Sequence, residues 1–106
     1  MPRSISCDAL ATLPSITLID VRKDRAKAAD PTTIRGACSR RPFAAETWWP
    51  EFAGRQVVVF CVHGHEVSQA VCGFLDDVGI EARYLEGGMA AWREAGLPTM
   101  ALEDAS

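Results

Sequence analysis

The sequence has no long hydrophobic run and no disulfide framework. No stretch of its 106 residues approaches the roughly 18 apolar residues of a membrane span, and the N-terminal Met-Pro-Arg-Ser-Ile-Ser lacks the apolar core of a signal peptide. The four cysteines are scattered rather than spaced as in a small secreted scaffold: Cys7, Cys38, Cys61 and Cys72. We therefore expect a cytoplasmic protein with free thiols and no membrane partner.

Aromatic residues and positive charge are also scarce. Aromatic residues make up 8% of the chain, the formal net charge is −3 at pH 7, and no basic stripe with interleaved aromatics is present. Nucleic acid is therefore not an expected partner. The chain does have 48% hydrophobic residues, which at this length suffice for one core. We predict a single domain over 1–106, with its core at about 4–98 and a tail, 99–106, whose polar end frays.

Hydrophobic patterning predicts strands that alternate with helices. Apolar, β-branched runs of strand length lie at 16–21, 57–62 and 82–85, with a shorter strand expected at 34–38. Helices are expected at 7–11, capped by Ser6 and closed by Pro14, at 89–95, and from Val67 to Val78, where apolar residues recur at helical spacing before Gly79. Shorter helical turns are expected within 22–30 and 43–52. The alternation predicts an α/β domain with a largely parallel sheet.

Cys61 stands where α/β proteins commonly bind ligands. It ends the most strand-like segment and precedes a loop that opens a helix, and ligands bind beyond the carboxyl ends of parallel strands. Free loop amides and the positive end of the helix dipole favour a thiolate there. Gly64 allows the positive φ that a loop needs to wrap its amides around one sulfur. We hypothesise that Cys61 is a nucleophile, and interpret the other three cysteines as packing residues.

Four motifs occur in order along the chain: Leu18-Ile19-Asp20-Val21-Arg22, Ile34-Arg35-Gly36-Ala37, Cys61-x-x-Gly64, and Leu85-Glu86-Gly87-Gly88-Met89-Ala90-Ala91-Trp92 ahead of Gly96-Leu97-Pro98. In this order and spacing they resemble a single-domain rhodanese over about residues 4–98. The resemblance implies a rhodanese-like fold, in which helices flank both faces of a central, largely parallel five-stranded sheet. It also implies a sulfurtransferase without a cofactor.

The same resemblance assigns roles to residues. Cys61 would take the outer sulfur of a donor such as thiosulfate, become a persulfide, and pass the sulfur to cyanide, a cellular thiol or a protein thiol. The amides that would bind the substrate and persulfide belong to Val62, His63, Gly64, His65, Glu66 and Val67. Asp20 and Arg22 are expected to tie the first strand to neighbouring loops, and Trp92 is expected in the core.

The length of the active loop leaves two interpretations open. Compared with the family pattern, the chain has one extra residue after Cys61, and the longer loop of related phosphatases and arsenate reductases holds a tetrahedral oxyanion. A helix that begins at Glu66, with Val67 on its apolar face, leaves a six-residue loop sized for sulfur, whereas Ser68 as N-cap gives the longer loop. No arginine lies between Cys61 and Ser68 to clamp a phosphate, so we favour sulfur transfer.

His63 and His65 suggest two further roles beside the nucleophile. They could assist an anionic donor when protonated, or form a metal site with Cys61. Cys-x-His-x-His is not a recurrent zinc spacing and no fourth ligand is evident, so no metal is expected.

Two alternatives concern partners and redox chemistry. The aromatic residues Phe43, Trp48, Trp49 and Phe52 are either a docking patch or core, with at least one indole expected in the core. A hypothesis from a different class is a non-catalytic binding or redox-sensing module, in which Cys61 is oxidised or pairs with another thiol.

Overall fold

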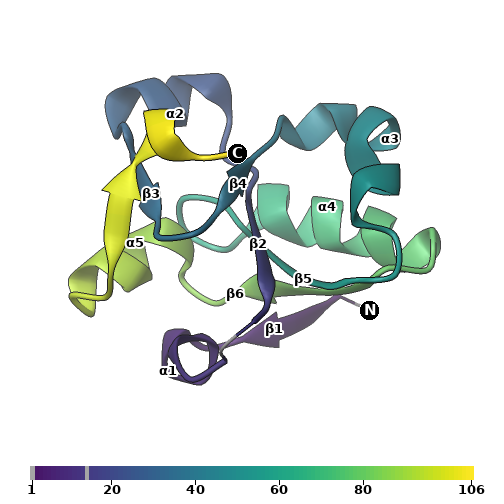
Figure 1. Cartoon of the computed structure of the whole chain (residues 1–106), viewed down its shortest axis with the longest axis horizontal. Helices are drawn as coiled ribbons and strands as arrows, with labels where there is room; N and C mark the ends of the chain where they lie inside the picture. The colour runs from purple at the N-terminus through teal and green to yellow at the C-terminus, as the bar shows by residue number, and fades with distance from the viewer. Residues whose placement is uncertain (1, 14) are drawn as a thin grey trace.

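A five-stranded parallel sheet forms the centre of the fold in the computed structural model, which describes residues 2–13 and 15–106. The strand order is β1 (Arg3–Ile5), β6 (Glu81–Leu85), β5 (Gln56–Phe60), β2 (Thr17–Asp20) and β4 (Cys38–Ser39), and every adjacent pair is parallel. Parallel neighbours require crossover connections, which the helices supply (Figure 1). The predicted α/β fold with a central parallel sheet is confirmed.

The central strand β5 shows why both faces of the sheet are covered. Val57 and Val59 enter one hydrophobic cluster, Val58 and Phe60 enter the other, and all four side chains are buried. The first cluster is covered by α3 (Ala45–Trp48) and α4 (Glu66–Asp77), and the second by α1 (Cys7–Ala11) and α5 (Gly88–Glu94). A continuous apolar run is what a strand covered on both faces requires.

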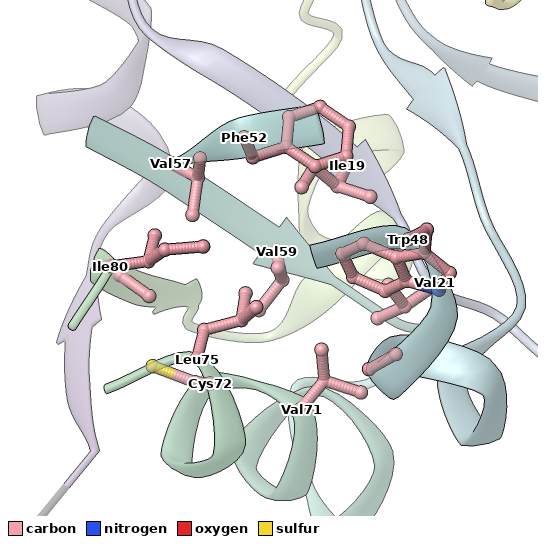
Figure 2. Packing of buried hydrophobic residues seen from close by; sticks show 12 residues of the cluster. Ile19, Val21, Trp48, Phe52, Val57, Val59, Val71, Cys72, Leu75 and Ile80 are labelled. Atoms are coloured by element: carbon pink, nitrogen blue, oxygen red, sulfur yellow. The ribbon is translucent and has the colours of Figure 1, made fainter. Parts of the chain in front are cut away.

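The hydrophobic cluster under α4 contains most of the aromatic side chains of residues 43–52, here called the aromatic segment. Figure 2 shows side chains of α4 and of the strands gathered around Val59. Trp48 and Phe52 are buried there with their rings edge to face at 5.7 Å, and the Trp48 indole donates to the Arg41 carbonyl at 2.8 Å. Trp49 is partly buried against the same cluster, whereas Phe43 is 70% exposed. The prediction that at least one indole lies in the core is confirmed, and of the aromatic patch Phe43 remains at the surface.

The region predicted as one strand at 34–38 is two strands in different sheets. β3 (Thr32–Ile34) ends before a turn at Gly36, whose φ is +85°, and β4 follows. β3 pairs antiparallel with β7 (Thr99–Ala101), a strand that the sequence patterning did not predict. β1 was also missed. Both strands are only three residues long and have no apolar run, so their pairing is set by distant partners.

The short helices follow the predicted regions. The side chain of Ser6 caps α1 by accepting from the Ala9 amide, as expected; the predicted stop at Pro14 lies outside the described residues. The segment after β2 contains α2 (Asp24–Ala29). The aromatic segment contains two 3-10 turns around α3, η1 (Pro42–Ala44) and η2 (Trp49–Phe52). No helix of the described ranges is long and apolar enough to cross a bilayer.

The end of the chain, where the sequence predicts fraying, makes hydrogen bonds to the rest of the domain. After β7, a 3-10 turn η3 (Leu102–Asp104) begins with an amide that donates to the Pro31 carbonyl at 2.8 Å. The Ser106 carbonyl accepts from the amide of Ser39 on β4 and from the Arg40 guanidinium, and Figure 1 shows the C-terminus beside β4. These hydrogen bonds involve mainly the backbone of residues 102–106. The hydropathy of the side chains therefore could not predict them.

Candidate active site

Cys61 follows β5 directly and lies at the carboxyl end of the sheet. Its side chain is 6% exposed, at the wall of a cavity of about 480 Å3. Six of the seven predicted site residues line this cavity: Cys61, Val62, His63, His65, Glu66 and Val67. The structure adds Arg22, Lys23 and Ala26 from the segment after β2. Two segments that are distant in sequence therefore form one hollow around the thiol.

Gly64 lies outside that cavity and packs the loop against its neighbour. Its φ is +75°, as the sequence predicted for this position. A Cβ atom there would also come within 2.6 Å of the Leu85 carbonyl oxygen and 2.8 Å of the Gly87 nitrogen. Gly64 is thus required twice, once for its backbone angle and once because the loop touches the turn between β6 and α5.

The first turn of α5 holds the active loop from behind. The Met89 amide donates to the Cys61 carbonyl at 2.8 Å, and the Ala90 amide donates to the Val62 carbonyl at 2.9 Å. Gly88, with φ +59°, leaves no room for a Cβ because it would overlap the Cys61 carbonyl oxygen. From the sequence, Gly87-Gly88 was only part of the motif that precedes the last predicted helix. The turn in fact fixes the loop by using amide donors that a helix N-terminus leaves unpaired.

The opposite side of the loop keeps its amides free. Within residues 2–13 and 15–106, the N–H groups from Val62 to His65 donate no hydrogen bond to another group of the chain. The amides of the first turn of α4 have no acceptor within that helix. The loop therefore retains donors that an anion at Cys61 could use.

Ser68, considered from the sequence only as one possible N-cap, lies beside the Cys61 sulfur. α4 begins at Glu66, as the six-residue interpretation of the loop predicted, with His65 at the N-cap position. Ser68 therefore does not cap the helix. Its side chain is fully buried in the first turn, and its Oγ lies 3.1 Å from the Cys61 Sγ.

The buried face of α4 is shifted by one position from the predicted apolar face, which consists of Val67, Ala70, Val71, Phe74, Leu75 and Val78. Ser68, Val71, Cys72 and Leu75 are buried, whereas Val67, Phe74 and Val78 are only partly buried. The hydrophobic spacing pointed to the larger residues because it gives no weight to a buried serine. The sequence did contain a sign that Ser68 is buried. Ser68 precedes Val71 by three residues and Leu75 by seven, and this helical spacing places it on the same face of the helix.

Arg22 lines the cavity, but its guanidinium is already bound. It forms a buried ion pair with Asp20 at 2.8 Å and donates to the carbonyls of Asp30 and Thr32. The Thr33 hydroxyl donates to the same Asp20 carboxylate at 2.8 Å. These contacts confirm that Asp20 and Arg22 tie the first long strand to the next loop. Trp92 is buried, as predicted, and its indole donates to the Pro98 carbonyl.

The rim of the cavity carries the remaining charged and titratable groups. His63, His65 and Glu66 are exposed, and the two imidazole rings are 6.4 Å apart. The Lys23 ammonium lies 5.7 Å from the centre of the Phe43 ring. No group of three histidine, cysteine, aspartate or glutamate side chains in the described chain is arranged to hold a metal ion.

The four cysteines are free thiols in different surroundings. Burial first, and then the Asp76 carboxylate, raises the pKa of Cys72 to about 11. Burial, followed by the Asp8 and Glu86 carboxylates, raises the pKa of Cys7. Both thiols therefore stay protonated at neutral pH. Cys38 is partly buried on β4.

Comparison with known proteins decides the family. A family model of the rhodanese-like domain matches residues 7–95. The chain belongs to the rhodanese-like domain family. The fold and the order of the motifs around Cys61 agree with this assignment. A comparison with the curated proteins gave no match.

Solved structures resemble this rhodanese-like domain over nearly its whole length. A rhodanese-related protein from Thermoplasma volcanium has 26% identity and a TM-score of 0.81, covering 92% of this chain and 97% of that one. A protein of unknown function from Rhodopseudomonas palustris, described as a possible tyrosine phosphatase, has 23% identity and a TM-score of 0.79, over 93% and 85% of the two chains.

A thiosulfate sulfurtransferase from Pseudomonas aeruginosa has 21% identity and a TM-score of 0.82, covering 99% of this chain but 20% of that one. At these identities the last two similarities establish the fold.

Proposed function

We propose that this rhodanese-like domain is a sulfurtransferase that carries a sulfane sulfur as a persulfide on Cys61. The strongest support for the proposal comes from the groups that surround the Cys61 sulfur. A buried hydroxyl lies 3.1 Å from it, the loop that follows has unpaired amides, and the thiol opens to a cavity of about 480 Å3. Such a site stabilises negative charge on sulfur by fixed hydrogen-bond donors, without a general base.

The first step transfers one sulfur atom to the enzyme. The Cys61 thiolate attacks the outer sulfur of thiosulfate, a new S–S bond forms, and the old S–S bond breaks. Sulfite leaves with the electron pair of the broken bond. The enzyme is left with a Cys61 persulfide anion, whose terminal sulfur carries the charge.

The second step returns the enzyme to its starting state. A thiophilic acceptor attacks the outer sulfur of the persulfide, and the Cys61 thiolate is the leaving group. With cyanide the product is thiocyanate; with a small or protein thiol it is a new persulfide. In both steps the negative charge lies on sulfur close to the loop amides of Val62 to Val67 and to the Ser68 hydroxyl, which donates to the thiolate form.

The structure offers less to a phosphatase reaction. A cysteine phosphatase needs a guanidinium that holds the phosphate oxygens with two parallel hydrogen bonds. Among the described residues that line the cavity, Arg22 is the one arginine, and its nitrogens are bound to Asp20 and to two carbonyls. We therefore favour sulfur transfer at Cys61 over a reaction that binds a tetrahedral oxyanion such as phosphate.

Mass spectrometry of the thiosulfate-treated protein tests the proposal. We expect a gain of about 32 Da, the mass of one sulfur atom, on the peptide that contains Cys61. Thiocyanate should form from thiosulfate and cyanide, and this activity should disappear in Cys61→Ala but persist in the matched control Cys38→Ala. Absence of the adduct with every sulfane donor tried would overturn the proposal. A stable sulfenate or disulfide after peroxide, together with no transfer activity, would favour the redox-sensing alternative.

A further inference from the structure

The charges around the Cys61 cavity nearly cancel, with one exception. The active loop, 62–67, contains no lysine or arginine. Of the two cations that line the cavity, Arg22 is neutralised by Asp20 in a fully buried pair. Lys23 has no carboxylate within ion-pairing distance in the described chain and is exposed. Glu66, which also lines the cavity, contributes a negative charge.

The Lys23 ammonium lies over the aromatic ring of Phe43. The ammonium is 5.7 Å from the ring centre, a cation–π distance, and the ring is 70% exposed. Lys23 and Phe43 also line a neighbouring hollow of about 470 Å3, where the other cation, Arg41, is paired with Asp24 at 3.5 Å. A largely solvent-exposed phenylalanine ring thus lies against the cation of the thiol cavity that has no carboxylate partner among the described residues.

We propose that Lys23, positioned by Phe43, is the anion-binding residue of the Cys61 cavity, and that it selects sulfur donors that carry negative charge. The inference rests on the proposed function, because it names the class of donor. A thiolate and an anionic donor repel each other as they approach. Lys23 offsets that repulsion, and it also offsets the charge that builds on the departing anion when the S–S bond of the donor breaks.

The opposing charge at the rim supports a second expectation. Glu66 lines the same cavity, and its carboxylate disfavours an anionic donor. Replacing it by glutamine should therefore lower the KM for thiosulfate by about twofold, the effect of one exposed charge. Lys23→Gln and Glu66→Gln should thus change the KM in opposite directions.

The test compares an anionic and a neutral reagent at the same sulfur. Iodoacetate and iodoacetamide both alkylate a thiolate with loss of iodide, and they differ by one negative charge. The measured quantity is the ratio of their rate constants at Cys61, at pH 8 and low ionic strength, followed by mass spectrometry of the Cys61 peptide. In Lys23→Gln we expect this ratio to fall by about fivefold and kcat/KM for thiosulfate to fall by about tenfold, through both a higher KM and a lower kcat.

Matched variants separate this effect from a general loss of charge or structure. Arg25→Gln removes an exposed cation of α2 that does not line the cavity and should leave the ratio unchanged. Lys23→Arg should preserve the ratio. Phe43→Leu, which keeps an apolar side chain, should lower it by about twofold by freeing the ammonium. Lys23 makes no capping hydrogen bond to α2, so its substitution should leave the helix intact.

The possible results distinguish this inference from the proposed function. Equal ratios in Lys23→Gln and Arg25→Gln would overturn the anion-binding role. If the wild-type protein forms no persulfide but its alkylation ratio depends on Lys23, the proposed sulfur transfer is wrong and the anion-binding role is supported.

Discussion

The Cys61 sulfur lies 3.1 Å from the hydroxyl of Ser68, which is seven residues further along the chain and in the first turn of α4. Both side chains are buried, so water contributes little to the stabilisation of charge on this sulfur. A hydroxyl in this place can accept from the thiol and donate to the thiolate. The protonation state of Cys61 and the orientation of Ser68 are thereby coupled.

Removing that hydroxyl should slow chemistry at Cys61. A hydrogen bond to a charged group contributes about 1.5–3 kcal/mol, so we expect Ser68→Ala to reduce the rate of persulfide formation by roughly tenfold or more. Ser68→Thr retains a hydroxyl and should recover most of the rate. Sulfite release in a single turnover measures the effect, and circular dichroism checks the fold. Identical rates for wild type and Ser68→Ala would show that the contact has no role in the reaction.

A methyl group at Gly88 should displace the active loop. The new Cβ would overlap the Cys61 carbonyl oxygen and come within 2.7 Å of the Val62 carbonyl oxygen. We expect Gly88→Ala to lower the free energy of unfolding by about 2–4 kcal/mol through strain and clash. Gly96, at the other end of α5, also has a positive φ but faces open space, so Gly96→Ala should cost only about 1 kcal/mol. Urea denaturation of both variants gives the comparison, and equal losses would refute the clash.

Asp30 should stabilise the protein at neutral pH and lose this effect in acid. Partial burial acts to raise the pKa of Asp30, but hydrogen bonds from Arg93 and Thr32 outweigh it and lower the pKa. A lowered folded-state pKa adds stability above the unfolded value, and this stability disappears as the pH falls through the folded value. We expect Asp30→Asn to cost about 1 kcal/mol at pH 7 and much less near pH 3.

Asp24→Asn is the control for that experiment. Asp24 is exposed and forms a single ion pair with an exposed Arg41, so its replacement should change stability little at either pH. Urea denaturation at pH 7 and near pH 3 measures the free energy of unfolding of each variant. An equal loss for Asp30→Asn at both pH values would contradict the stabilising role of the Asp30 carboxylate.

Cys72 should make the protein less stable in alkali. Its folded-state pKa of about 11 lies above that of an ordinary thiol, so the folded state favours the protonated form. Stability is therefore fully present below the ordinary thiol pKa and is lost as the pH rises through the folded value. Relative to Cys72→Ala, wild type should lose up to about 2 kcal/mol over this range. Denaturation curves between pH 8 and pH 11 measure this difference, and parallel curves for the two proteins would contradict it.

Strong local patterns made part of the fold and site predictable. The apolar run of β5, the glycine after Cys61 and the helical spacing of α4 together located the sheet, the loop and the helix, and left Glu66 as one of two possible helix starts. The β3–β7 pair was not predictable in the same way. Thr33 opposes Met100 across that pair, and neither short segment has a hydrophobic period. Their partnership depends on backbone hydrogen bonds formed after distant parts of the chain meet.

The missed site residues have a common physical reason. Ser68 is buried because a sulfur atom faces it, and Lys23 reaches the cavity because β2 lies beside β5 in the sheet. Neither relationship can be predicted from hydropathy, because hydropathy describes how a side chain interacts with water and not which specific group it contacts. Cys61 was identified because its surroundings, a strand end and a helix start, are themselves visible in the sequence.

The hydrogen bonds from Met89 and Ala90 to the Cys61 and Val62 carbonyls also set an order of events during synthesis. A ribosome makes Cys61 and the following helix well before residues 88–90 exist. Until those residues emerge, the loop has its sulfur and its glycine but not the donors that fix its backbone. β1 likewise waits for its parallel partner β6, which is made later. The nascent chain therefore carries the Cys61 thiol before residues 88–90 can fix the backbone on which that thiol stands.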